Sequence, residues 1–171
     1  MFLRMLKKAN YFLREYEILD FPISIELIQE IFNDLNYRIV IIKNMKQHGT
    51  IYADNILITG INSACLRENM CHECGHIVSH HYNQYCDDKI QIIKNEAQAQ
   101  AFAAYLLMPV FIFEETIKYC NNDYEVSEEF GVNVEFVQYR KTLTAGLVRI
   151  NYFKKTRNKF NEFGSIHSNI F

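Results

Sequence analysis

Residues 72–76 constrain the fold of this chain more than any other stretch of its sequence. They read His-Glu-Cys-Gly-His and follow Ser63, where apolar residues begin to recur at a helical period. At 100° per residue, Leu66, Met70 and Ile77 share one face, and the two histidines lie roughly on the opposite one. The sequence therefore predicts a helix with a core side and a ligand side.

The HExxH spacing within this helix suits zinc chemistry. Histidines at i and i+4 stand one above the other, so His72 and His76 can both reach one tetrahedral Zn²⁺, while Glu73 points toward the metal's bound water. The metal lowers the pKa of that water, and Glu73 can accept its proton and pass it to a leaving amine. The pattern therefore predicts peptide hydrolysis, although ligand type alone does not distinguish Zn²⁺ from Mn²⁺ or Fe²⁺.

An open zinc site needs a third protein ligand. His80 continues the ligand face, but residues i and i+8 lie about 12 Å apart on a helix, so three histidines of one helix cannot converge. A further histidine ligand spaced as in the metzincins is absent, because Ser79 and Tyr82 occupy the required positions. Glu96 remains, on a predicted return helix after 19 intervening residues, where neighbouring alanines permit close approach.

Hydrophobic spacing predicts the remaining elements. We expect a helix over 24–35, a strand over 37–44, a hairpin over 50–61, helices over 93–108 and 111–120, and a helical pair over 125–143. Together they predict an α+β fold: a small antiparallel sheet packed with helices, the HExxH helix, a Glu-ligand helix and a helical C-terminal part. We expect a single domain over residues 1–171, with its core at about 21–143 and a basic extension over 144–171.

Composition limits the partners and the compartment. A formal charge of −2 and a pI near 6.3 give no bulk attraction to nucleic acid or to anionic membranes. The longest apolar run, from Ala101, is too short to span a bilayer and contains Pro109. The N-terminus has no signal-peptide pattern, and the five dispersed cysteines do not suit a disulfide framework. We therefore expect a cytoplasmic protein with reduced thiols.

Two stretches together resemble a known family. "HECGHIVSHH" followed by "EAQAQAFAAYLLMP" is similar to the ImmA/IrrE-type metallopeptidases, whose pattern is HExxH and then E-x-x-A-N-x-F-A-x-x-L-L-M-P. The matching positions of the second stretch are Glu96, Ala99, Phe102, Ala103, Leu106, Leu107, Met108 and Pro109. The likeness extends over roughly residues 21–143.

This resemblance implies a gluzincin-like site with one Zn²⁺, in which His72, His76 and Glu96 are the ligands and Glu73 is the general base. It also implies an endopeptidase that cleaves and inactivates a helix-turn-helix transcriptional repressor, as the anti-repressor of a mobile element or a stress response. The family's Asn is Gln100 here. Such a residue can orient a ligand histidine by a hydrogen bond to the ring nitrogen that does not bind the metal. We therefore expect a somewhat altered ligand geometry.

Several side chains near the motif have competing interpretations. Cys71 and Cys74 form a C-x-x-C, but a redox or structural-zinc site would need a βαβ context or a second C-x-x-C, so we expect Cys74 in the core. His80 could assist the site, yet a polar helix end accounts for it equally well. Tyr139 and Arg140 are candidates for oxyanion stabilisation that spacing alone does not assign.

The helical pair over 125–143 offers a second class of function. It could form a helix-turn-helix and make the chain a non-proteolytic repressor- or DNA-binding module. Its first half is acidic and would repel phosphates, so direct nucleic-acid binding is disfavoured. An intact Glu73 also argues against a purely structural metal site. For the peptidase, residues 50–58 are expected at the cleft edge, where an extended substrate could pair.

Overall fold

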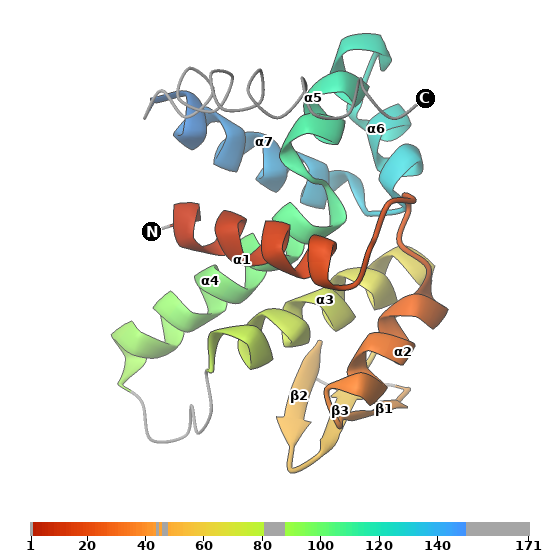
Figure 1. The fold of residues 1–171 in the computed structure, drawn as a ribbon, viewed down its shortest axis with the longest axis vertical. Coiled ribbons are helices and arrows are strands. Elements are labelled where there is room, and N and C mark those ends of the chain that lie inside the picture. The colour runs from red at the N-terminus through yellow and green to blue at the C-terminus, as the bar shows by residue number, and fades with distance from the viewer. Residues whose placement is uncertain (1, 44, 46–47, 81–87, 150–171) are drawn as a thin grey trace, which may run out of the picture.

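The computed structural model describes residues 2–43, 45, 48–80 and 88–149, which form seven helices and a three-stranded sheet (Figure 1). The helices are α1 (Phe2–Glu15), α2 (Ile25–Asp34), α3 (Ser63–Ser79), α4 (Lys89–Leu107), α5 (Val110–Tyr119), α6 (Asp123–Phe130) and α7 (Val134–Arg149). The strands are β1 (Arg38–Ile41), β2 (Gly49–Tyr52) and β3 (Asn55–Ile58). The α+β fold class is confirmed.

Helix α1 was not predicted from the sequence. Met5, Leu6, Ala9 and Phe12 are buried at helical spacing, and Figure 1 shows the helix crossing α4. Three basic residues interrupt the apolar positions and obscured this pattern. One of them, Lys8, donates a hydrogen bond of 2.7 Å to the carbonyl of Val78, which ties α1 to the C-terminal end of α3.

The sheet is mixed, which corrects the antiparallel sheet expected from the sequence. The predicted hairpin is present, because β2 pairs antiparallel with β3 around a turn in which Ala53 has φ 51°. Strand β1, however, pairs parallel with β3, giving the order β1-β3-β2. Strand β3 takes the centre because its Ile56 and Ile58 are fully buried, whereas β1 is mostly exposed and suits an edge.

Helices α3 and α4 form the antiparallel pair that positions the site. Helix α3 begins after Asn62, whose side chain caps Cys65 N–H at 2.7 Å, and α4 begins after Asp88, which caps Gln91 N–H at the same distance. Pro109 follows the last turn of α4, as expected from the sequence. The inner face of α4 carries Ala99, Phe102 and other buried side chains of the central hydrophobic core.

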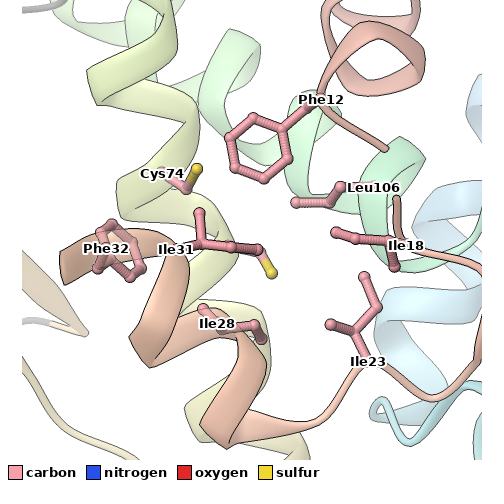
Figure 2. A pocket seen from close by; sticks show the side chains of 9 residues that line it. Phe12, Ile18, Ile23, Ile28, Ile31, Phe32, Cys74 and Leu106 are labelled. Carbon is pink, nitrogen blue, oxygen red and sulfur yellow. The ribbon is translucent and has the colours of Figure 1, made fainter. Parts of the chain in front are cut away.

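A small cavity lies in this core between α1, α2, α3 and α4. Figure 2 shows Phe12, Ile28, Ile31, Cys74 and Leu106 pointing toward it from these four helices. All nine lining residues are apolar or cysteine, so no convergent polar group is present to orient a substrate. This cavity is therefore a local gap in core packing.

The C-terminal part is helical, as expected. Helix α7 continues to Arg149 and therefore includes the first residues of the predicted basic extension over 144–171. The remainder of that extension lies outside the described residues.

Within the described ranges, no single helix has the length and apolarity needed to cross a membrane; α4 and α5 pass that test only as a pair bent by 63°.

Candidate metal centre

Helices α3 and α4 bring three of the predicted site residues together. His72 Nε2 lies 3.0 Å from His76 Nε2 and 3.1 Å from Glu96 Oε2, and His76 Nε2 lies 3.4 Å from Glu96 Oε1. Among the residues that the structure describes, these three form the group whose atoms could hold a metal ion. The return helix therefore presents Glu96 to the two histidines as the sequence predicted.

These separations fit the ligand set of a tetrahedral metal. With bonds of about 2.0–2.1 Å from zinc to nitrogen or oxygen, neighbouring ligand atoms of a tetrahedron lie about 3.3–3.4 Å apart. The three distances of 3.0, 3.1 and 3.4 Å fall close to that value. Two imidazoles and one carboxylate are also the donor set of open catalytic zinc sites. The residues therefore fit a zinc ion, and the fourth position of the tetrahedron has no ligand from this group.

Gln100 orients the imidazole of His72 through the ring nitrogen that does not face the cluster. Its Oε1 lies 2.9 Å from Nδ1 of His72. An amide oxygen only accepts hydrogen bonds, so Nδ1 of His72 donates to it, and Nε2 is the ring nitrogen that faces the cluster. The Gln in place of the family's Asn still reaches the histidine, because α4 places it one turn beyond Glu96.

The ligand cluster is buried on one side and open on the other. The side chain of His76 is 6% exposed, that of His72 is 19% exposed and that of Glu96 is 47% exposed. Hydrogen bonds from His72 and His76 hold the pKa of Glu96 well below its usual range. Burial lowers the pKa of His72, but the hydrogen bond to Glu96 and the nearby charge of Glu73 outweigh it and raise that pKa overall. A metal entering from the open side would take the place of the hydrogen bonds between these three side chains.

Glu73 lies against strand β2. The residue is 5% exposed, and its carboxylate packs directly against Gly49, where any Cβ would collide with Oε1. Burial raises the pKa of Glu73, and the nearby charges of His72 and His76 lower it, with a net increase. This contact of Gly49 was not predicted, because nothing in the sequence places residue 49 beside residue 73.

The other candidates lie away from the cluster. His80 is the exposed C-cap of α3, with left-handed backbone angles of φ 57° and ψ 40°, one turn beyond His76. Arg140 is fully buried, donates to the carbonyl of Met108 at 2.8 Å, and stacks on the rings of Tyr105 and Phe113. Its contacts are those of a core residue.

The C-x-x-C cysteines are core residues as well. Cys71 is fully buried and Cys74 is 2% exposed, and both thiols are free. Burial raises the pKa of both thiols. A redox pair needs a lowered thiol pKa and access to solvent, so this environment disfavours redox chemistry.

The helical pair over 125–143 is formed by α6 and the first half of α7. Glu68 of α3 accepts hydrogen bonds from Asn133 N–H at 2.5 Å and from its side chain at 3.1 Å, just before α7 begins. Arg67 donates to the carbonyls of Ile23 and Gly131 on the other side of the same turn. The start of α7, which would have to enter a DNA groove in a helix-turn-helix, is thus held against an acidic side chain of α3.

Comparisons with known proteins bear on the family and on the fold. Residues 65–142 match the family model Peptidase_M78, described as IrrE N-terminal-like domain. No curated protein matches the chain. Among solved structures, the chain is similar to a Mycobacterium tuberculosis transcriptional regulator with a TM-score of 0.66 at 14% sequence identity, over 80% of this chain and 46% of that chain. At this identity the likeness shows a shared fold, over about half of the regulator's length.

Proposed function

We propose that this chain is a zinc-dependent endopeptidase of the ImmA/IrrE type, because the IrrE N-terminal-like family model matches its residues 65–142. His72, His76 and Glu96 are the proposed metal ligands. The observation that carries the proposal is the spacing of their donor atoms, which lie 3.0–3.4 Å apart, close to the edges of a zinc tetrahedron. The family-model match supports the peptidase class, and the donor geometry supports a tetrahedral metal such as zinc.

Glu73 is the proposed general base. When bound, zinc would supply a Lewis acid for the scissile carbonyl and lower the pKa of a water molecule. Glu73 would accept the proton of that water and deliver it to the leaving amine. Its buried carboxylate suits this double role, because burial shifts its pKa upward toward neutrality. The packing of Gly49 against the carboxylate restricts where Glu73 can point.

Strand β2 is the proposed docking edge for substrate. In the sheet order β1-β3-β2 it is an edge strand, and none of the described strands pairs with its outer side. His48 and Thr59 form a hydrogen-bonded pair, so the alternating ladder turns the backbone groups of Gly49 and Ile51 outward. An extended peptide pairing there would pass beside Glu73.

The docking proposal predicts an effect of the outward N–H of Ile51. Ile51→Pro removes that donor without removing a bond to β3, and Ile51→Val keeps it. In a zinc-loaded Glu73→Gln background, peptide affinity should fall about 5-fold in the proline variant, as expected for one hydrogen bond, and stay unchanged in the valine variant. Equal affinity in both variants would remove the docking proposal.

The proposed substrate is a helix-turn-helix transcriptional repressor. This assignment comes from the family resemblance, and the shared fold with a transcriptional regulator agrees with a role in gene regulation. We propose a single cytoplasmic domain that meets its substrate as a free protein. Cleavage would relieve repression, as expected of an anti-repressor from a mobile element or a stress response.

The deciding experiment measures metal content and proteolysis on the same preparations. The wild type should bind about one zinc per chain by elemental analysis, and Glu96→Ala should lose most of it. Glu73→Gln should retain zinc and lose cleavage, monitored by mass spectrometry on peptide libraries and on purified helix-turn-helix repressors. A wild type that takes up no zinc would contradict the proposal.

A binding module built on α6 and α7 is the alternative. It predicts that Glu73→Gln relieves repression in cells as well as the wild type does, because binding needs no general base. Hydrogen bonds of Arg67 with Gly131 and of Glu68 with Asn133 fix the α6–α7 turn against α3, which favours the peptidase instead. Loss of relief in a zinc-loaded Glu73→Gln variant would exclude the binding module.

A further inference from the structure

Helices α3 and α4 approach each other closely at Gly75, next to the metal ligands. A Cβ built on Gly75 would lie 2.8 Å from Cα and 2.9 Å from the carbonyl oxygen of Ala99. Real Cβ atoms essentially never approach other atoms within 3.0 Å. The obstacle is helix backbone, which cannot rotate away as a flexible side chain could.

This contact lies beside ligands on both helices. Gly75 directly precedes His76, and Ala99 is three residues after Glu96 and directly before Gln100. The distance between the two helix backbones at this point therefore sets how far Glu96 and Gln100 stand from the histidines. The three contacts that depend on it are 2.9, 3.1 and 3.4 Å long.

The size of the expected displacement can be compared with what a metal site tolerates. An added methyl group would lie 2.8 Å from Cα of Ala99, and ordinary van der Waals contact begins at 3.4 Å, so full relief of the clash needs a local separation of about 0.6 Å. Metal–ligand distances are held within about 0.2 Å. The displacement is about three times that tolerance.

The surroundings leave little room to absorb such a shift. Ala99, Ala101, Phe102 and Ala103 are all fully buried, so α4 cannot slide along α3 without disturbing the core. The exposed side of the pair is the side on which Glu96 lies. Separation of the helices would therefore move the carboxylate away from the histidines.

We infer that Gly75 is a positioning residue for the metal centre, which sets the distance between the two histidines of α3 and Glu96 of α4. This inference rests on the proposed zinc site and adds a requirement that ligand identity alone does not include. A chain with all three ligands and a side chain at position 75 would bind zinc weakly.

The test compares two glycines in helices. Gly75→Ala and Gly146→Ala add the same methyl group and the same gain in helix propensity, but a Cβ at Gly146 meets no atom within 4 Å. Zinc affinity of each purified protein is measured by competition with a chelator. We expect at least a 10-fold weaker Kd for Gly75→Ala and an unchanged Kd for Gly146→Ala.

A cobalt spectrum separates ligand displacement from general destabilisation. Cobalt(II) in the wild-type site should show the strong visible absorption of four-coordinate cobalt, and Gly75→Ala should shift or weaken it, whereas a merely less stable fold would leave the spectrum of the folded fraction unchanged. If Gly75→Ala does not fold, Ala99→Ser adds one atom to the same crossing and should shift Kd and spectrum in the same direction.

Two outcomes would overturn the inference in distinguishable ways. A wild type that binds neither zinc nor cobalt removes both this inference and the proposed function. If the wild type binds one metal, and the folded Gly75→Ala or Ala99→Ser variant has the same Kd and the same spectrum, Gly75 has no positioning role. The peptidase proposal would then remain intact.

Discussion

Oε1 of Gln100 lies 2.9 Å from Nδ1 of His72, so the second helix of the site both supplies a candidate ligand and orients a ligand of the first. Helix α4 achieves this with Glu96 and Gln100, which are one turn apart on the same face. The two helices therefore form the site together, and loss of a contact between them should lower the affinity for the metal.

Removal of this hydrogen bond is expected to weaken metal binding. Gln100→Leu keeps the size of the side chain and loses the acceptor, which frees the imidazole of His72 to rotate and change tautomer. We expect zinc affinity to fall about 10- to 100-fold, as measured by chelator competition. Gln98→Leu, on the opposite side of α4, serves as the matched control. Equal affinity in both variants would show that Gln100 does not orient His72.

Glu68 should make stability depend on pH. Burial raises its pKa above 4.5, and the hydrogen bonds from Asn133 offset only part of that shift. The folded state then keeps the proton to higher pH than the unfolded state does, so the stabilisation is full below pH 4.5 and is lost as pH rises through the folded pKa.

Glu68→Gln removes this titration while keeping an acceptor for Asn133. The unfolding free energy of the wild type, measured by urea denaturation, should fall relative to the variant as the pH is raised from 4 upward and then level off. Glu30→Gln, at an exposed position of α2, is the control. A difference that grows with pH in favour of the wild type would contradict the prediction.

The paired thiols should be unreactive in the folded protein. A variant with Cys65, Cys86 and Cys120 replaced by Ser retains only Cys71 and Cys74, whose thiol pKa values are raised by burial. Their reaction with a disulfide reagent should be at least about 100-fold slower than in the urea-unfolded chain. Rapid reaction, or an internal disulfide formed in the folded state, would instead support a redox pair.

Arg140 should matter for folding rather than for the site. Arg140→Met removes hydrogen bonds of 2.8 Å to Met108 and 2.6 Å to Thr144, together with the stacking on Tyr105. We expect a loss of about 2–4 kcal/mol in unfolding free energy, because removal of the buried charge offsets only part of the lost contacts.

Zinc affinity of folded Arg140→Met should remain that of the wild type, because no contact of Arg140 reaches the ligand cluster. Arg149→Met, at the exposed end of α7, controls for loss of a positive charge. A stable variant that binds zinc normally but has lost peptide cleavage would assign Arg140 to the reaction.

The sequence by itself determined the local parts of this site. The spacing of His72 and His76 places both on one helix face, because helical geometry is set by the backbone over a few residues. Pro109 ends α4 for an equally local reason, since it lacks the N–H that another turn would need. Glu96 could be selected because the alternatives on the same helix are out of reach.

Tertiary structure decided whatever depends on residues far apart in the chain. Three examples are the parallel pairing of β1 with β3, the packing of α1 on α4 and the burial of Arg140. Each depends on which surfaces of distant segments are buried against one another, and a local hydrophobic period does not contain that information. The same holds for the contacts of Gly49 with Glu73 and of Gly75 with Ala99. The absence of a Cβ at these glycines is important only because another residue packs closely against them, and only the tertiary structure shows which residue that is.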